Sequence, residues 1–249
     1  MSNDPVLLLH GQPGAAADWE RLRGAVGDRV RTIALDRPGW DGRSRATDLS
    51  GNARAALAAL DRAGVERATV VGHSLGAAVA AWLAQSAPAR VGRLVLVAPA
   101  ANRDSLGKID YLLAAPVVGW LTSVGAMAGG GLVLAVRPAR RWVAEATALD
   151  DRYLHAAERM LLAPAAWRSF LREQRYLIRD LPALEQRLSA ITAPTTIVAG
   201  SGDHVVPIAA ARRLAGQIPG AELVEVPHAG HLLHVQHVGR VAEIVLSRS

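Results

Sequence analysis

The feature that most constrains the fold is a set of six short runs of β-branched and aliphatic residues along the chain. Such runs are typical of strands that are buried on both faces of a parallel sheet. They are residues 6–10, 30–36, 68–73, 93–99, 195–200 and 222–227. Helical stretches at 52–64, 75–88 and 208–220 lie between them. This alternation predicts an α/β fold with a doubly wound, mostly parallel sheet that helices cover on both faces.

The alternation stops between about Asn102 and Ser189, where no convincing strand pattern is found. Helical patterns follow Pro138 and Pro164 in this region. We therefore predict a helical insertion between two core strands. The core would consist of residues 1–101 and 190–249, and the insertion, a helical cap, of residues 102–189.

One part of the predicted cap, residues 111–136, contains no charged residue. A run of that length is long enough to span a membrane. However, a single span here would place Ser74 and the strand at 195–200 on opposite sides of the membrane and divide the sheet. We expect no transmembrane span, and favour apolar helices that pack over a pocket. A partly exposed face that touches lipid or a partner stays open as an alternative.

Composition excludes several classes of function. The chain has no cysteine, which rules out disulfides, thiolate metal sites and a cysteine nucleophile. Its first residues show no basic segment followed by a long apolar one, so we expect no signal peptide and a cytoplasmic protein. The net charge is +6, but the arginines are scattered among acidic residues and cluster only at 137–142. This pattern argues against nucleic acid as a partner, and it leaves the oligomeric state open.

The sequence Gly-His-Ser-Leu-Gly at 72–76 joins a predicted strand directly to a predicted helix. A serine in such a turn can act as an exposed nucleophile, and glycines on either side of it avoid collisions in the sharp turn. The alternative is a phosphate-binding turn at a helix N-terminus. Because the spacing of a phosphate-binding loop is missing, we favour Ser74 as a nucleophile.

A serine nucleophile needs a base, which is usually histidine. Four histidines follow the last predicted strand, and we expect His231 to be the base, with His228 as its rival. The other two are His234 and His237. Clustered histidines can also form a metal site, but the spacing indicates no further ligands. We therefore expect neither a metal nor a cofactor.

The base in turn needs an acceptor that orients it. Asp203 follows the predicted strand at 195–200 and is our candidate, although an aspartate there could simply cap the next helix. Asp104, which follows an earlier strand, is the second choice. An oxyanion would need two backbone N–H donors. Leu75 directly follows the nucleophile, and Gln12 follows the first predicted strand, so we expect the oxyanion hole at these two residues.

Together these residues resemble the α/β-hydrolase superfamily, specifically its small esterase-like serine hydrolases with a helical cap. The resemblance rests on HGQPG (10–14), DRPGWDGRS (36–44), GHSLG (72–76), GSGDHVVP (200–207) and HAGHLLH (228–234). The motifs occur in the family's order, and so do the serine, aspartate and histidine. The resemblance implies an α/β-hydrolase fold, here with a short N-terminus that lacks the usual first hairpin.

The resemblance also implies an activity. Ser74 would attack a carboxylic ester, thioester or lactone with an apolar moiety, with His231 as base and Asp203 as its partner. The N–H groups of Gln12 and Leu75 would hold the oxyanion. We expect His73 beside the substrate. Trp40 is expected there as well, because the chain has one residue more than the family pattern between Gly39 and Gly42.

Other functions on the same fold stay open. Hydrolases of C–C bonds that resemble the meta-cleavage enzymes usually carry tryptophan after the catalytic histidine, where this chain has Leu232. Dehalogenases and epoxide hydrolases use aspartate at the position of Ser74, so the serine argues against these two activities. A non-hydrolytic enzyme of the same fold, such as a lyase or a cofactor-free perhydrolase, also stays open. A silent ligand-binding protein is a further alternative, although such proteins often lose a triad member and all three are present here.

Overall fold

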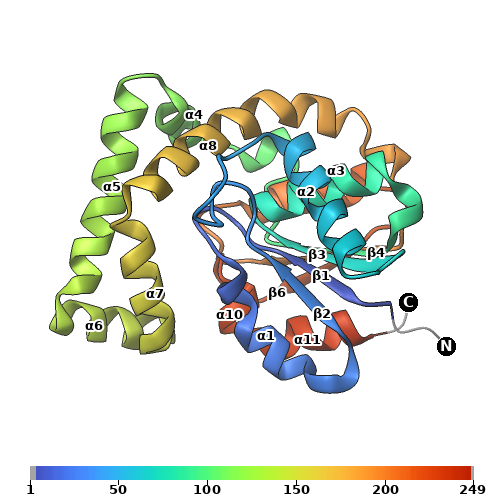
Figure 1. Ribbon diagram of the computed structural model, residues 1–249, viewed down its shortest axis with the longest axis horizontal. Helices are drawn as coiled ribbons and strands as arrows, with labels where there is room; N and C mark the ends of the chain where they lie inside the picture. The colour runs from blue at the N-terminus through green and yellow to red at the C-terminus, as the bar shows by residue number, and fades with distance from the viewer. Residues whose placement is uncertain (1–3, 248–249) are drawn as a thin grey trace.

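The computed structural model describes residues 4–247 and contains a six-stranded parallel sheet with helices on both faces (Figure 1). The first residues of the short predicted N-terminal segment, 1–3, lie outside the described residues. The strand order is β2-β1-β3-β4-β5-β6. The strands are β1 (Val6–Leu9), β2 (Thr32–Leu35), β3 (Ala68–His73), β4 (Val91–Val97), β5 (Thr195–Gly200) and β6 (Glu222–Val226). The predicted fold class is confirmed. The first and last residues of each predicted strand differ by at most two positions from those of an observed strand.

Successive side chains of each strand point to opposite faces, so each strand contributes to two apolar layers. Leu7 and Leu9 of β1 pack toward the side covered by α2 (Leu49–Arg62), α3 (Leu75–Ser86) and α9 (Ile208–Gln217). Val6 and Leu8 pack toward α1 (Glu20–Val26) and α11 (Val238–Leu246) on the other side. Burial on both faces explains why the strand sequences are apolar throughout.

Five helices lie between β4 and β5 and form the cap, whose outer part stands beside the sheet domain in Figure 1. They are α4 (Lys108–Ala114), α5 (Val118–Ala135), α6 (Arg137–Thr147), α7 (Asp151–Leu161) and α8 (Pro164–Glu185). The helical pattern after Pro138 corresponds to two helices, because Ala148 takes a left-handed conformation with φ 54° and Asp150 caps the next helix through the N–H of Tyr153.

The last cap helix belongs to both parts of the molecule. Leu177, Leu181 and Leu184, in the second half of α8, are buried in the same apolar cluster as α3. The first half of α8 lies over the carboxyl ends of the strands instead. Part of the segment that we predicted as cap therefore packs as core, because a 22-residue helix is long enough to reach both.

By length and composition, α5 alone among the described helices could cross a membrane. Only 28% of this helix is buried inside the molecule. Most of it therefore does not pack over the pocket, in contrast to what we predicted for the apolar segment at 111–136.

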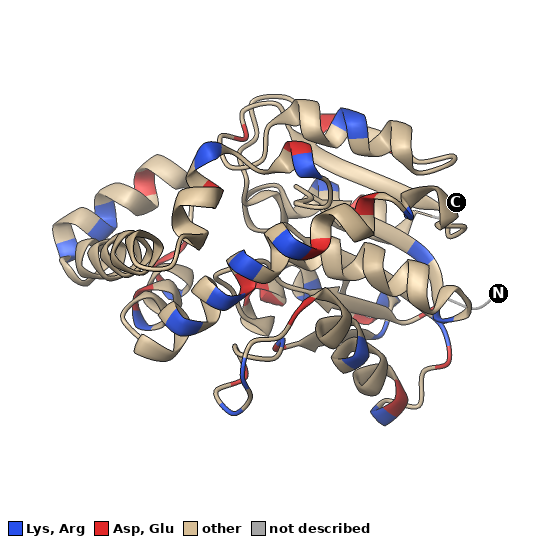
Figure 2. Cartoon of the chain, turned by 90° about the horizontal axis from the view of Figure 1, so that it is seen from above, with Lys and Arg blue, Asp and Glu red and all other residues tan. Residues whose placement is uncertain are grey.

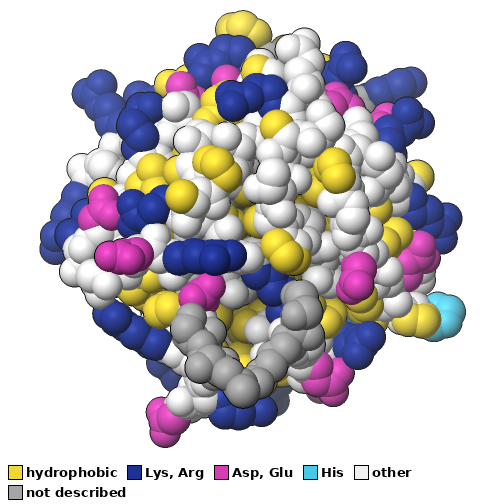
Figure 3. Space-filling model, turned by 90° about the vertical axis from the view of Figure 1, so that its right-hand side faces the viewer, with side chains coloured by type: hydrophobic (Ala, Val, Ile, Leu, Met, Phe, Trp, Pro, Cys, Tyr) yellow, Lys and Arg dark blue, Asp and Glu magenta, His cyan; other side chains and the backbone are white. Residues whose placement is uncertain are grey.

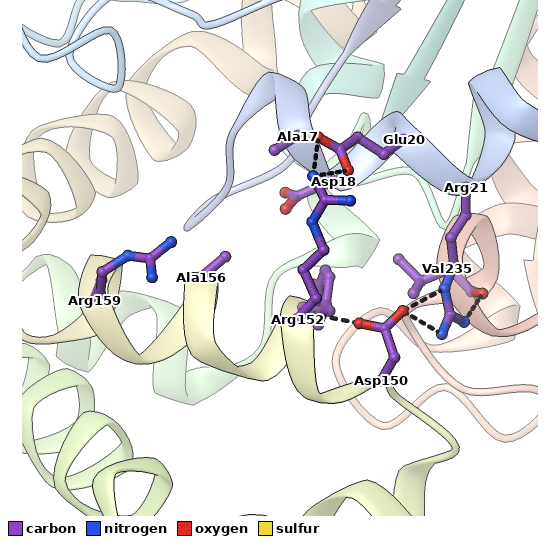
Figure 4. Close-up of a pocket in the computed structure, with 10 residues that line it drawn as sticks. Ala17, Asp18, Glu20, Arg21, Asp150, Arg152, Ala156, Arg159 and Val235 are labelled. Carbon is purple, nitrogen blue, oxygen red and sulfur yellow. Dashed lines mark hydrogen bonds and ion pairs between the residues drawn. The ribbon is translucent and has the colours of Figure 1, made fainter.

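Two ion pairs join the cap to the core beside a cleft of about 390 Å³ (Figure 4). Arg21 of α1 lies 2.6 Å from Asp150, and Arg152 of α7 lies 3.1 Å from Glu20. Exposed pairs of this kind contribute at most about 1 kcal/mol each. We conclude that these pairs set the position of α7 without holding the cap strongly.

Asp18 lies in the same cleft, and the stability of the folded protein depends on the protonation of its carboxyl group. Burial raises the pKa of this carboxyl from 3.8 to about 6, although the N–H of Ala15 donates to it at 3.0 Å. A raised pKa means that the folded protein favours the neutral acid, so stability falls as pH rises from about 4 to 6.

Replacing Asp18 by asparagine removes this titration and keeps an oxygen acceptor. We expect Asp18→Asn to raise the free energy of unfolding at pH 8 by about 1–3 kcal/mol. At pH 4 the gain should nearly vanish. Urea unfolding at the two pH values measures this, with exposed Asp28→Asn as the control. An equal effect of Asp18→Asn at both pH values would contradict the assignment.

Candidate active site

Ser74 occupies a strained turn between β3 and α3. Its backbone has φ 52° and ψ −120°, a conformation that is rare for a residue with a side chain. The N–H of Ser74 donates to the carbonyl oxygen of Val97 in β4 at 3.0 Å, which fixes the turn at the carboxyl edge of the sheet. Strain of this kind is found where a fold presents a functional side chain.

Glycines permit the backbone to pack this closely. A Cβ atom at Gly72 would lie 2.3 Å from the carbonyl oxygen of Gly76, and one at Gly76 would lie 2.2 Å from that of Leu9. Either atom would overlap backbone that has no room to move. The turn at Ser74 therefore depends on both glycines, as the motif indicates.

Asp203 and His231 come from loops after β5 and β6 and meet by a direct hydrogen bond. His231 Nδ1 lies 2.8 Å from Asp203 Oδ2. The other carboxylate oxygen accepts the N–H groups of Val205 and Val206 at 2.8 and 2.9 Å. Because the ionised carboxylate only accepts, the proton lies on Nδ1 and leaves Nε2 of His231 as a base.

The two rival residues lie elsewhere. Asp104 is bound in an exposed ion pair with Arg213 at 2.6 Å. His228 is exposed, has φ 58° and donates its N–H to the hydroxyl of Ser201. Neither residue lines the cavity that contains Ser74.

Three buried histidines lie near the base, and one of them, His73, contacts His231 directly. Burial lowers the pKa of His10 and His73 well below the ordinary value, and lowers that of His234 to about 3. The His73 ring lies 4.8 Å from that of His231, and its Nε2 is 3.0 Å from the His231 carbonyl oxygen. A neutral neighbour adds no charge that would oppose an imidazolium at His231. The contact between His73 Nε2 and the His231 carbonyl oxygen also helps to position the loop that carries the base.

The loop after β1 is held by Arg37, whose role the sequence did not reveal. Its buried guanidinium donates to the carbonyl oxygens of His10 and Gly11 at 2.9 and 2.7 Å. On its other side it pairs with the carboxylate of Glu173 in α8, which is also buried. This pair connects the loop of Gln12 to the cap.

The pair could not be found from sequence patterns, because its members are 136 residues apart. Arg37 is part of the DRPGWDGRS motif, but nothing in that motif names Glu173 as its partner. Burial raises the pKa of Glu173, while Arg37 and the indole N–H of Trp40 act against that rise.

Trp40 is placed differently from our expectation. Its indole N–H donates to Glu173 Oε2 at 2.8 Å, and its ring meets that of His10 edge to face. It is not among the described residues that line the cavity. The extra residue after Gly39 therefore directs Trp40 toward the Arg37–Glu173 pair and away from a substrate.

Ser74, His231, His73, Gln12 and Leu75 all line one cavity of about 580 Å³ between the sheet and the cap. Apolar side chains from α4, α5, α7 and α8 form most of its wall, among them Leu113, Leu134, Leu154, Phe170 and Leu177. This volume lies within the range of small-molecule sites. The structure thus brings the predicted nucleophile, base and oxyanion donors together under an apolar cap.

A short polar chain crosses the wall of the cavity. The side-chain amide of Gln12 donates to Gln174 Oε1 at 2.6 Å, and that of Gln174 donates to Asp110 at 2.9 Å. Gln12 Oε1 is buried and has no hydrogen-bond partner among the described residues. A buried acceptor of this kind can receive a donor from a ligand.

Known proteins are similar to this chain over nearly its whole length. The chain is 28% identical to a 2-hydroxy-6-oxononadienedioate/2-hydroxy-6-oxononatrienedioate hydrolase of Burkholderia vietnamiensis (strain G4 / LMG 22486), over 98% of this chain and 86% of the relative. It is also 28% identical to a protein of Klebsiella pneumoniae (strain 342) that is provisionally named as the carbamate hydrolase RutD, over 92% and 85% of the two chains.

A solved structure and a protein family match over a similar length. The structure is an α/β hydrolase fold protein from Burkholderia ambifaria, with a TM-score of 0.81 and 25% identity, over 99% of this chain and 91% of the other. Residues 4–238 match the family described as the alpha/beta hydrolase fold. The chain is therefore a hydrolase that belongs to the α/β-hydrolase fold family.

Proposed function

We propose that this protein is a serine hydrolase that cleaves carboxylic esters, thioesters or lactones with an apolar moiety. The observation that carries the proposal is that His231, which is hydrogen-bonded to Asp203, lines one apolar cavity together with Ser74. Serine is a weak nucleophile unless a base removes its proton, and this pair provides an oriented base.

In the proposed first step, Ser74 Oγ attacks the carbonyl carbon and its proton passes to His231 Nε2. The imidazolium is stabilised by the Asp203 carboxylate at 2.8 Å. The carbonyl oxygen becomes an oxyanion, which receives hydrogen bonds from the N–H groups of Gln12 and Leu75. Leu75 suits this task because the first N–H groups of a helix have no partner within it.

Collapse of the oxyanion breaks the bond to the alcohol, which leaves with the proton of His231. Water then attacks the acyl-enzyme while His231 takes one of its protons. Release of Ser74 Oγ, protonated by His231, yields the acid and restores the starting state. The same sequence of steps serves an ester, a thioester or a lactone.

The charge of the cavity favours an apolar substrate over a dianion. Among the described residues that line it there is no lysine or arginine, and Asp110 is acidic. The name of the Burkholderia vietnamiensis relative indicates a dicarboxylate substrate, which would need cations for its carboxylates. In addition, Leu232 follows His231 where C–C bond hydrolases of this kind usually have tryptophan. Both points favour ester cleavage.

A panel of p-nitrophenyl esters, together with a phosphonate probe of active-site serines, tests the proposal. We expect labelling of Ser74 and a rise in kcat/KM of at least about tenfold from a two-carbon to an about eight-carbon acyl chain. A dienedioate C–C substrate should be turned over poorly. Turnover of that substrate alone, with no labelling of Ser74, would contradict the proposal. A preference for the shortest esters would contradict only its apolar part.

A further inference from the structure

The exposed large hydrophobic side chains are concentrated on the cap. Among the described residues, 4–247, eleven of the twelve lie between Ile109 and Trp142, and Val205 is the exception. On the opposite end of the molecule, charges of both signs are interspersed among the hydrophobic side chains (Figure 3). A concentration of exposed apolar side chains on one part of a folded protein often marks an interaction site. We call the exposed apolar side chains from Ile109 to Trp142 the outer cap face.

The helix α5 is apolar toward the outside and small toward the inside. Its buried residues recur at near-helical spacing, and three of the five are glycine or serine: Gly119, Ser123, Met127, Gly131 and Leu134. A Cβ atom at Gly131 would lie 2.8 Å from the side chain of Leu162, so small residues allow close packing. Trp120, Leu121 and Leu132 are 51%, 59% and 62% exposed. This is the reverse of a helix that faces a protein core.

The position of α5 makes this surface accessible. It forms the outer edge of the cap, farthest from the sheet in Figure 1, with α4 at one end and α6 at the other. Figure 2 shows charged residues along the neighbouring helices, whereas α5 carries none. Ile109 is 59% exposed and also lines the cavity of Ser74, so the outer cap face is continuous with that cavity.

Cationic side chains border the apolar surface at the α6 end. Arg137 and Arg141 line a shallow cleft of about 430 Å³ together with Trp142, which is 69% exposed. Glu145 also lines this cleft, but neither arginine forms an ion pair among the described residues. Unpaired arginines suit phosphate groups, and tryptophan is enriched where an apolar layer meets headgroups.

We propose that the outer cap face docks on the surface of a bilayer that contains anionic phospholipid. The helix α5 lies in the plane of the interface with its large side chains among the acyl chains, and Arg137 and Arg141 contact the headgroups. The arginine border favours an anionic lipid surface over a second copy of the chain, which would bring like charges into the apolar contact. The buried stripe of α5 keeps the helix packed on the cap, so it does not cross the membrane.

Sedimentation with vesicles tests this proposal without reference to catalysis. We expect the full-length protein to bind vesicles of phosphatidylcholine with about 30% phosphatidylglycerol at least about tenfold more strongly than pure phosphatidylcholine. Raising NaCl from about 0.05 to about 0.5 M should weaken binding without abolishing it, because salt screens the arginines and not the apolar contact.

Three double variants, each of which lowers the net charge by two, separate the contributions. Leu121→Asp/Leu132→Asp and Arg137→Ala/Arg141→Ala should each reduce binding by about tenfold or more. Arg54→Ala/Arg62→Ala, on α2 of the core, is the matched control and should bind almost normally. Circular dichroism and thermal unfolding check that each variant is folded.

Several results would overturn the proposal. These are absence of binding to either vesicle, an equal loss in all three variants, and a dimer in lipid-free solution that Leu121→Asp/Leu132→Asp dissociates. Binding that only detergent reverses, with α5 protected from proteases on both sides, would indicate a span instead. If the protein fails to bind vesicles, the proposal of ester hydrolysis is not affected, since the assay measures lipid binding and not turnover.

Discussion

Replacing Ser74 by alanine is expected to lower kcat for ester hydrolysis by about 10⁴- to 10⁶-fold and to abolish labelling by a serine probe. The reason is that no acyl-enzyme can form without the Ser74 hydroxyl, and only the oxyanion donors and substrate binding remain. Steady-state kinetics with the best p-nitrophenyl ester at saturating substrate, with a high enzyme concentration for the slow variant, measures the loss.

The variant should fold normally, because serine and alanine differ by one buried oxygen. Its free energy of unfolding should stay within about 1 kcal/mol of the parent. Ser86→Ala, at the exposed end of the same helix α3, serves as the matched control and should keep full activity. A Ser74→Ala variant that retains turnover would show that another group performs the attack.

Removing the Glu173 carboxylate is expected to cause the largest loss of stability of any single change proposed here. Glu173→Gln leaves the Arg37 guanidinium buried without a counter-charge. Loss of one partner of a buried pair typically costs about 3–5 kcal/mol. Urea unfolding measures the change, and Glu225→Gln, in the exposed pair with Arg212 at 2.7 Å, is the control and should cost at most about 1 kcal/mol.

Activity should fall together with stability in this variant, for a separate reason. Arg37 holds the carbonyl oxygens of His10 and Gly11, directly before Gln12. If the loop shifts, the N–H of Gln12 moves from the position of the oxyanion, and kcat should drop by about 10²-fold with little change in KM. A double variant, Arg37→Met/Glu173→Leu, removes both buried charges but leaves the carbonyl oxygens of His10 and Gly11 without their donor. It should therefore recover part of the stability but not kcat. Normal kcat in the folded Glu173→Gln variant would mean that the pair holds the cap only.

Much of the core was predictable because its signals are local. The strands are buried on both faces, so each is a continuous apolar run that can be recognised without its neighbours. The turn at Ser74 is also recognisable from its own five-residue motif, and the atoms that a Cβ at Gly72 would meet lie only four to five residues further on. The atoms that a Cβ at Gly76 would meet belong to Leu9 and His10, which are distant in the sequence. Asp203 and His231 each follow a strand, and parallel strands end at one edge of a sheet. Their proximity therefore follows from the fold class.

The cap was much less predictable. The apolar segment at 111–136 indicates burial, but hydropathy does not say whether protein or lipid surrounds a side chain. The small residues on α5 can be explained only in the folded structure, where α7 and Leu162 pack closely against them. Trp40 illustrates the same limit, because the residues around Gly39 do not indicate whether a tryptophan there faces a substrate or a carboxylate.

The α/β sheet, the turn that presents Ser74 and the order of the candidate catalytic residues can thus be predicted from the amino-acid sequence, because strand burial and the motif around Ser74 are encoded by residues close together in the chain. The Arg37–Glu173 pair, the position of Trp40 and the outward face of α5 become known from the folded structure alone. Each of these depends on contacts between segments far apart in the chain, and the free energy of such contacts leaves no pattern in either segment alone.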